Sequence, residues 1–221
     1  MNISGSFPAD WAYTRVTRFT VTSQAGIVEL LVNGVQKPRA VALICHPHPL
    51  HGGSLDNKVV FTLARACRDS GIVAVRFNFR GVGCSTGVHD NGVGELDDAN
   101  LVLSCISLEL PGLPIVLAGF SFGAAIVAQL AQTTPCAGLL LSTPPVPRYG
   151  LDKIATVAAP VLLLQCDDDE VVDSATVYNW FEQLSAPQKM SQQWPKGGHF
   201  FHGMLTELKS SAEKFLSVLP I

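Results

Sequence analysis

Ile115-Val-Leu-Ala-Gly119-Phe-Ser121-Phe-Gly123-Ala-Ala-Ile-Val-Ala-Gln-Leu-Ala131 is the stretch of this chain that most directly determines its fold. An apolar, partly β-branched run meets Gly-x-Ser-x-Gly, and a run of small, helix-forming residues follows at once. This order predicts a strand, a sharp turn and a helix, with Ser121 at the crest of the turn. Gly119 and Gly123 leave room where the backbones crowd. The pattern therefore indicates that Ser121 is a nucleophile.

A second copy of the same motif, Gly83-Cys-Ser85-Thr-Gly87, lies earlier in the chain. The residues that follow it, Val-His-Asp-Asn-Gly, show no helical period. Because a nucleophile turn needs a helix directly behind it, Ser85 is interpreted as a loop serine.

Apolar runs alternate with helical patterns along most of the chain. They predict strands at 15–22, 27–32, 39–45, 72–77, 114–118, 137–141, 161–165 and 189–194, and helices at 59–70, 95–110, 122–132, 174–184 and 205–216. The turn residues of 23–26 predict an N-terminal antiparallel hairpin. The alternation after residue 39 predicts a mainly parallel, right-handed sheet with helices on both faces. Repeats and long linkers are absent from the sequence, so we expect residues 1–221 to form a single domain.

Composition narrows the class of protein. The 221 residues are 48% hydrophobic and 15% charged, which suits strands covered on both faces. A net charge of −3 without a basic cluster argues against binding to nucleic acid or to an anionic membrane surface. The uncharged stretch 110–147 is broken by prolines and glycines, so it does not predict a membrane span. The first residues lack the pattern of a secretion signal, and we expect a soluble, cytoplasmic protein.

Six cysteines are spread through the chain without a Cys-x-x-Cys pair. Most lie in apolar runs, and we expect buried free thiols. Cys45 and Cys166 fall at the ends of expected strands, so a cysteine nucleophile is an alternative to Ser121.

In a parallel sheet, reacting groups collect at the carboxyl ends of strands. The strand at 161–165 leads into Cys166-Asp167-Asp168-Asp169-Glu170, and the strand at 189–194 leads into Gly197-Gly198-His199-Phe-Phe-His202. A serine attacks only if a base accepts its proton and a carboxylate orients that base. The two segments supply candidates for both groups. His199 follows two flexible glycines, whereas His202 adjoins the last helix and is expected to be structural.

The order of serine, acid and histidine resembles the α/β-hydrolase superfamily. Two further segments, His46-Pro-His-Pro-Leu-His-Gly-Gly53 and Asn78-Phe-Arg-Gly-Val-Gly-Cys-Ser85, are similar to a group of small bacterial serine hydrolases that lack a lid. The resemblance implies an α/β-hydrolase fold of about eight strands without a lid domain. It also implies that Ser121, Asp169 and His199 are catalytic and that no cofactor is needed. The family's acidic tract begins with glycine where this chain has Cys166, so Asp167 and Asp168 stay open as alternatives to Asp169.

The implied activity is hydrolysis of small soluble carboxylic esters through an acyl-enzyme. A thioesterase or small-peptide hydrolase with the same three residues is an alternative, as is a non-catalytic binding protein. The oxyanion should meet the backbone N–H of Phe122 and a second donor from the 46–53 loop. Proline has no N–H, so His48 is the first candidate and Leu50 the second. The expected partner is the small ester, and the oligomeric state is left open.

The spacing His46-x-His48-x-x-His51 supports a different hypothesis. It resembles the zinc-binding pattern of metallo-β-lactamases, with Leu50 in the place of an aspartate. A metal-dependent hydrolase is therefore a further alternative, although the preferred interpretation is that these histidines line a pocket.

Fewer than 20 residues separate the strands near 142 and 161, where lipase-like relatives insert a lid. Because this connection is too short for a lid, we expect an open pocket. Its expected apolar walls are residues 143–147, Phe120, Phe122, Phe200 and Phe201.

Overall fold

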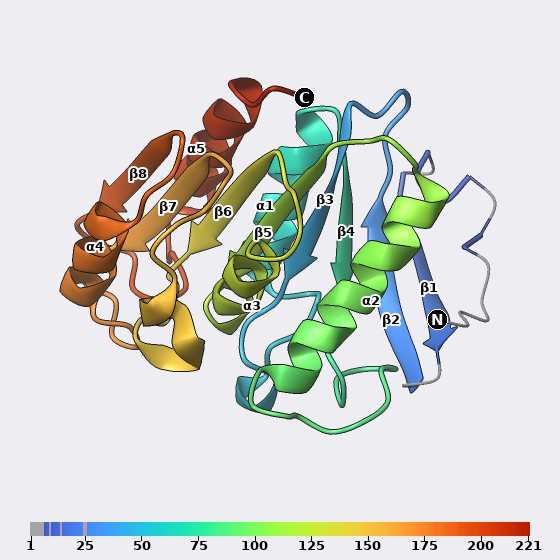
Figure 1. Cartoon of the computed structure of the whole chain (residues 1–221), viewed down its shortest axis with the longest axis horizontal. Coiled ribbons are helices and arrows are strands. Elements are labelled where there is room, and N and C mark those ends of the chain that lie inside the picture. The colour runs from blue at the N-terminus through green and yellow to red at the C-terminus, as the bar shows by residue number, and fades with distance from the viewer. Residues whose placement is uncertain (1–6, 9, 14, 24–25) are drawn as a thin grey trace.

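The computed structural model describes residues 7–8, 10–13, 15–23 and 26–221, which form an eight-stranded sheet flanked by helices (Figure 1). The strands are β1 (Thr17–Ser23), β2 (Gly26–Asn33), β3 (Ala40–Cys45), β4 (Ile72–Phe77), β5 (Ile115–Phe120), β6 (Gly138–Ser142), β7 (Val161–Cys166) and β8 (Lys189–Trp194). The helices are α1 (Lys58–Asp69), α2 (Val93–Glu109), α3 (Phe122–Leu130), α4 (Ser174–Gln183) and α5 (Leu205–Ser217).

The strand order is β1-β2-β4-β3-β5-β6-β7-β8. The pairs β1–β2 and β2–β4 are antiparallel, and all later pairs are parallel. The predicted hairpin and mainly parallel sheet are therefore confirmed. The predicted hairpin turn includes residues 24 and 25, which lie outside the described residues.

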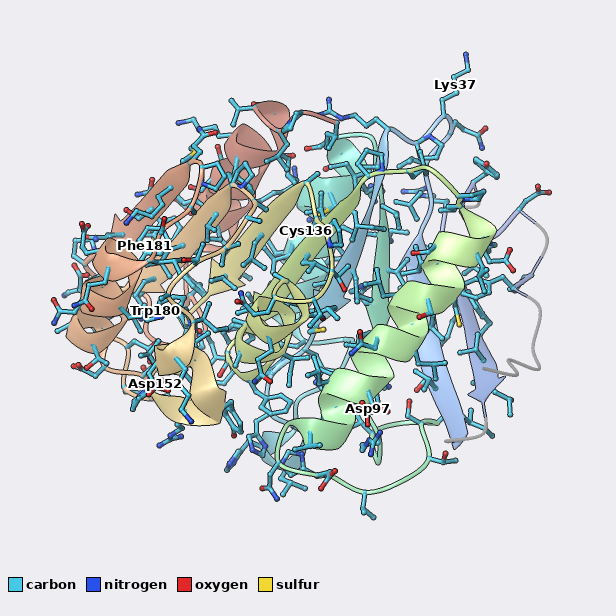
Figure 2. All side chains as sticks on the ribbon, in the orientation of Figure 1. Lys37, Asp97, Cys136, Asp152, Trp180 and Phe181 are labelled. Atoms are coloured by element: carbon cyan, nitrogen blue, oxygen red, sulfur yellow. The ribbon has the colours of Figure 1, made fainter. Side chains whose placement is uncertain are left out.

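Apolar side chains fill the space on both faces of the sheet (Figure 2). Helices α2, α3 and α4 cover one face, and α1 and α5 cover the other. Strand β3 shows why its run is continuously apolar. Val41 and Leu43 belong to the first core, whereas Ala42 and Ile44 belong to the second. A strand covered on both sides needs apolar residues at every position.

Local side-chain chemistry sets where the helices begin. The side chain of Asn57 accepts hydrogen bonds from the N–H groups of Val59 and Val60, so α1 begins at Lys58, one residue before the predicted start. Glu95 accepts from the N–H of Gly92 at 2.8 Å, and α2 begins at Val93, two residues before the predicted start.

Two short 3-10 helices were not predicted from the sequence. They are η1 (Pro49–His51), after β3, and η2 (Arg148–Lys153), after β6. Residues 143–160 connect β6 to β7 and hold η2 but no lid domain. Within the described ranges, no helix combines the length and apolarity needed to cross a membrane.

Candidate active site

Ser121 stands at the turn between β5 and α3. Its φ of 53° lies in the left-handed region that side chains rarely adopt, as expected for a strained nucleophile turn. A Cβ atom on Gly119 would collide with the carbonyl of Gly123, and one on Gly123 would collide with the carbonyl of Cys45. The N–H of Ser121 donates to the carbonyl of Ser142 at 2.8 Å. The absence of a side chain at both glycines thus allows the backbone segments to pack closely around the turn from which the Ser121 side chain projects.

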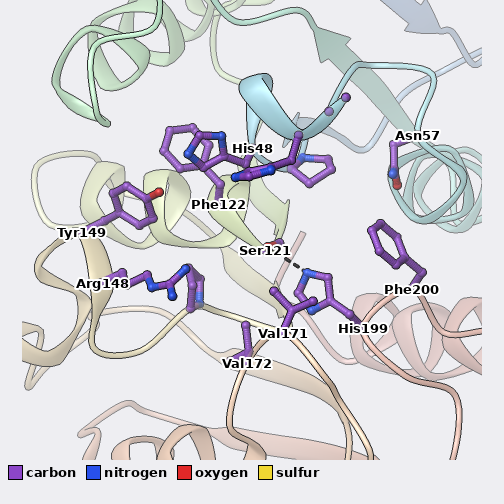
Figure 3. Close-up of a pocket in the computed structure, with 15 residues that line it drawn as sticks. His48, Asn57, Ser121, Phe122, Arg148, Tyr149, Val171, Val172, His199 and Phe200 are labelled. Carbon is purple, nitrogen blue, oxygen red and sulfur yellow. Dashed lines mark hydrogen bonds between the residues drawn. The ribbon is translucent and has the colours of Figure 1, made fainter.

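A continuous chain of polar contacts links Ser121, His199 and Asp169 (Figure 3 draws the first contact). Ser121 Oγ lies 3.0 Å from His199 Nε2. His199 Nδ1 lies 2.9 Å from Asp169 Oδ2 and 3.1 Å from Oδ1. These residues follow β5, β8 and β7, so three strand ends bring them together.

The carboxylate of Asp169 is fully enclosed and has several donors. Its Oδ1 accepts the N–H groups of Val171 and Val172, both at 2.9 Å, and its Oδ2 accepts Gln165 Nε2 at 3.0 Å. Burial by itself would raise the pKa of Asp169. The hydrogen bonds from His199 and the two backbone N–H groups outweigh that effect, and its pKa lies below the ordinary value.

The neighbouring acids contact other groups. Asp167 accepts the Tyr178 hydroxyl at 2.8 Å, and Asp168 accepts the N–H of Gly198 at 2.8 Å. Of the three candidate aspartates, the structure thus places Asp169 against the His199 ring. The other late histidine, His202, is exposed, and its Nδ1 lies 3.1 Å from Lys58 Nζ.

Backbone N–H groups near Ser121 differ in their availability. The N–H of Leu50 donates to His48 Nδ1 at 3.2 Å. Within the part of the chain that the structure describes, the N–H groups of Phe122 and His48 have no acceptor. The rings of these two residues lie 5.2 Å apart, so both residues border the same space. The geometry therefore leaves Phe122 and His48 free to donate and engages Leu50.

Ser121 and His199 open into a cavity of about 420 Å³. The cavity is lined by Pro47, His48, His51, Gly52, Gly53, Asn57, Ser121, Phe122, Pro145, Arg148, Tyr149, Val171, Val172, His199 and Phe200. In Figure 3, Arg148 and Tyr149 lie on the opposite side of Ser121 from Asn57 and Phe200. Such a mixture of apolar walls and a few polar groups is typical of a site for a small molecule.

The predicted cavity walls are only partly correct, because Phe120, Phe201 and all of residues 143–147 except Pro145 do not line the cavity. Phe120 belongs to the core on the α1 and α5 side of the sheet, and its ring packs 5.1 Å from the ring of His199. Phe201 has a φ of 52° and lies fully buried in the same core. Phe122, Pro145 and Phe200 do line the cavity, as predicted.

Comparison with known proteins identifies the family. A family model described as serine aminopeptidase, S33, matches residues 36–156, which is more than half of the chain. The chain belongs to this family of α/β serine hydrolases. An uncharacterised protein of Rickettsia prowazekii (strain Madrid E) is 36% identical over 185 residues, covering 80% of this chain and 78% of the relative.

Solved structures agree with the family. This α/β serine hydrolase is 40% identical to an α/β serine hydrolase homologue from Coxiella burnetii, with a TM-score of 0.83 over 90% of this chain and 96% of that one. It is 35% identical to a serine hydrolase without a lid from Xanthomonas campestris, with a TM-score of 0.88 over 99% of each chain.

The predicted metal alternative does not fit the histidine loop of this hydrolase. His46 Nε2 accepts the N–H of Phe79 at 3.0 Å, so His46 Nδ1 carries the proton and donates to the Pro47 carbonyl at 2.6 Å. Burial lowers the pKa of His46 to about 4. Both ring nitrogens are therefore occupied. In the described ranges, no group of three or more His, Cys, Asp or Glu residues is arranged to hold a metal ion.

The alternative nucleophiles are also engaged or buried. Ser85 donates to the Asn78 carbonyl at 2.7 Å and accepts the N–H of Glu29 at 2.9 Å. Cys45 and Cys166 are buried free thiols, and burial raises the pKa of both, that of Cys166 to about 12. A thiol that stays protonated is a poor nucleophile.

The sequence provided no direct signal for several residues of the cavity. Arg148 and Tyr149 come from η2, and Val171 and Val172 follow the acidic tract after β7. The one available hint was position, because all four lie in segments that follow the carboxyl end of a parallel strand.

Proposed function

We propose that this serine hydrolase cleaves small carboxylic esters through an acyl-enzyme. The observation that carries the proposal is the chain of contacts from Ser121 through His199 to Asp169, at 3.0 and 2.9 Å. His199 Nε2 is close enough to take the serine proton, and Asp169 holds the imidazole in the tautomer with its proton on Nδ1.

The reaction follows from these positions. Ser121 Oγ attacks the ester carbonyl while its proton moves to His199 Nε2. The N–H groups of Phe122 and His48 are the proposed donors to the resulting oxyanion, and each such donor typically contributes about 3 kcal/mol. Collapse breaks the bond to the alcohol, which leaves with the proton from His199. Water, deprotonated by His199, then attacks the acyl group, releases the acid and restores Ser121.

Hydrolysis of peptides is the main alternative, because the matching family model is described as a serine aminopeptidase. An aminopeptidase must bind the protonated α-amino group of its substrate, and a carboxylate is the usual counter-charge. No Asp or Glu is among the described residues that line the cavity. This charge distribution favours esters over peptides with a free amino terminus.

Activity-based labelling tests the proposed nucleophile. A fluorophosphonate should form an adduct on Ser121, located by mass spectrometry, and Ser121→Ala should lose both the adduct and turnover of short 4-nitrophenyl esters. Ser85→Ala is the matched control, since it alters the second Gly-x-Ser-x-Gly copy. That variant should keep the label while losing stability, because two hydrogen bonds of a buried hydroxyl disappear.

Aminoacyl 4-nitroanilides complete the test, and we expect much slower turnover of these substrates than of esters. An unlabelled Ser121, or full ester turnover by Ser121→Ala, would refute the proposed nucleophile. Faster turnover of aminoacyl anilides with a free amino group than of esters would replace the ester proposal with the peptide alternative.

A further inference from the structure

Arg148 is the only lysine or arginine among the described residues that line the cavity. Its guanidinium has no carboxylate within ion-pair distance and no hydrogen-bond acceptor in the described ranges. By contrast, Arg18, Arg68 and Arg80 each pair with a carboxylate of the same chain. The one arginine that lines the same cavity as Ser121 therefore has no side-chain partner within the described residues.

The backbone around Arg148 is held firmly against the site. The N–H of Arg148 donates to the Pro145 carbonyl at 2.7 Å. The carbonyl of the next residue, Tyr149, accepts Gln129 Nε2 from α3 at 2.7 Å. The Tyr149 ring packs edge-on against Phe122, the residue that follows the nucleophile, with 4.9 Å between ring centroids. In Figure 3, the Arg148 side chain extends from η2 toward the centre of the cavity.

The described side chains that share the cavity wall with Arg148 leave its charge unpaired. The cavity has no acidic side chain among its described lining residues, and His48 and His51 also border it. Burial lowers the pKa of His48, as do the neighbouring His89, His51 and Arg148, whereas Glu95 raises it. The His48 ring is therefore neutral at neutral pH and does not compete with Arg148 for an anion. Asp169 is not among the lining residues, and its two oxygens are occupied by His199 and three other donors, so it does not pair with Arg148. Among the described lining residues the one fixed charge is therefore positive, although the protein as a whole carries a net charge of −3.

We propose that Arg148 binds a carboxylate carried by the substrate, so that the enzyme prefers esters with a negatively charged group remote from the scissile carbonyl. This inference rests on the proposed ester hydrolysis and adds the substrate class. A guanidinium presents a planar fork of donors that matches a carboxylate with two parallel hydrogen bonds. Both possible substrate types carry a carboxylate. In a half-ester of a dicarboxylic acid the carboxylate is on the acyl side, and in an ester formed by the hydroxyl of a hydroxy acid it is on the leaving group.

Two pairs of substrates of matched shape test the charge preference. Mono-4-nitrophenyl adipate and its neutral methyl ester place the charge on the acyl side. Acetoxybenzoate and its methyl ester place the charge on the leaving group. The wild-type enzyme should have the higher kcat/KM for the charged member of at least one pair, mainly through KM. The preference should weaken with added salt, as a charge interaction does in water.

Substitution then assigns the preference to Arg148. Arg148→Gln should lower the ratio of kcat/KM for the charged ester to that for its neutral partner by roughly 10- to 100-fold, the usual range for losing a hydrogen-bonded charge. Arg148→Lys keeps the charge but not the planar fork of donors, and its charged-to-neutral ratio of kcat/KM should lie between those of wild type and Arg148→Gln. Arg65→Gln is the matched control, because Arg65 is an exposed arginine of α1 that does not line the cavity.

The outcomes separate this inference from the proposed function. Labelling of Ser121 without any charge preference, or a preference that Arg148→Gln leaves intact, overturns the role of Arg148 alone. Failure to label Ser121 overturns the proposed function. If Ser121 is labelled but neither pair is hydrolysed, adipate should slow labelling of the wild-type protein and not of Arg148→Gln. Equal protection of both proteins overturns the inference. Circular dichroism checks that the variant is folded, which we expect because Arg148 is exposed.

Discussion

A buried carboxylate such as Asp169 keeps its charge only if donors replace the water that it has lost. His199, Gln165 and two backbone N–H groups face its two oxygens. These contacts hold its pKa below the ordinary value despite burial. An ionised Asp169 in turn keeps the proton of His199 on Nδ1, which leaves the lone pair of Nε2 directed at Ser121. In the proposed mechanism, Asp169 thus acts by orienting His199.

Replacement of this acid tests the assignment among the three aspartates. Asp169→Asn presents an amide in place of the carboxylate, and we expect kcat to fall by roughly 10³- to 10⁴-fold because the imidazole adopts the wrong tautomer. Asp167→Asn is the control, since its amide oxygen can still accept the Tyr178 hydroxyl, and its kcat should stay close to wild type. Steady-state ester hydrolysis measures both. Similar losses in the two variants would contradict the role assigned to Asp169.

Among the elements, the loop after β7 organises the loop after β8. Asp168 and Glu170 flank Asp169, and their carboxylates accept the N–H groups of Gly198 and His199 at 2.8 and 3.0 Å. Three consecutive acids of one loop therefore hold two backbone groups and one side chain of the other. Alternating contacts of this kind fix the position of the histidine before substrate arrives, which is how a site avoids reorganisation during the reaction.

Glu170 should consequently act as a positioning residue for His199. Glu170→Ala removes the acceptor of the His199 N–H, and we expect kcat to fall by about 10-fold with little change in KM, since loss of one hydrogen bond to a charged group at an exposed site has this order of effect. Glu170→Gln keeps an acceptor and should restore most of the activity. Glu182→Ala, on the exposed surface of α4, provides the control. Equal kcat values for Glu170→Ala and wild type would exclude this role.

At the scale of the whole molecule, sheet order explains why distant residues meet. Ser121 and His199 are 78 positions apart, and Asp169 and His199 are 30 apart. Parallel strands β3, β5, β6, β7 and β8 place their carboxyl ends along one edge of the sheet. Strand β3 lies next to β5, so the loop that carries His48 adjoins the turn that carries Ser121. The candidate site therefore forms at the edge of the sheet where the carboxyl ends of these strands lie.

The folding stability of the whole molecule should depend on His46. Its folded pKa of about 4 lies below the value of roughly 6.5 for an unfolded chain, because burial disfavours the charged ring. The unfolded state therefore binds more protons between these values. The contribution of neutral His46 is fully present above pH of about 6.5, and it is lost as the pH falls toward about 4, by up to about 1.4 kcal/mol per pH unit.

Urea unfolding of wild type and His46→Gln between pH 7.5 and 5 measures this linkage. As the pH falls, the free energy of unfolding of wild type should decrease more steeply than that of His46→Gln. The difference in unfolding free energy between the two proteins should therefore become smaller. His202→Gln, which alters an exposed histidine, should parallel wild type. Parallel curves for wild type and His46→Gln would show that His46 does not titrate on unfolding.

The sequence by itself determined the strands, the helices and the turn at Ser121, because these depend on neighbouring residues. Apolar runs or apolar alternation marked β1 to β7, whereas β8 is mostly polar, and Gly119 and Gly123 marked the turn. The residue pattern after β7 and β8 also narrowed the acid and base to a few candidates. The choice of Asp169 and His199 rested on the family resemblance, and the structure places those two in contact.

Only the tertiary structure decided which side chains face the cavity. Arg148 borders it because Gln129 and Phe122, both on α3, hold the neighbouring Tyr149 in place. Phe120 and Phe201 turn into the core instead, and the surroundings of His46 occupy both its ring nitrogens. The physical reason is common to all of them. The direction of a side chain and the partners available to it depend on contacts between segments far apart in the chain, and local periodicity carries no record of those contacts.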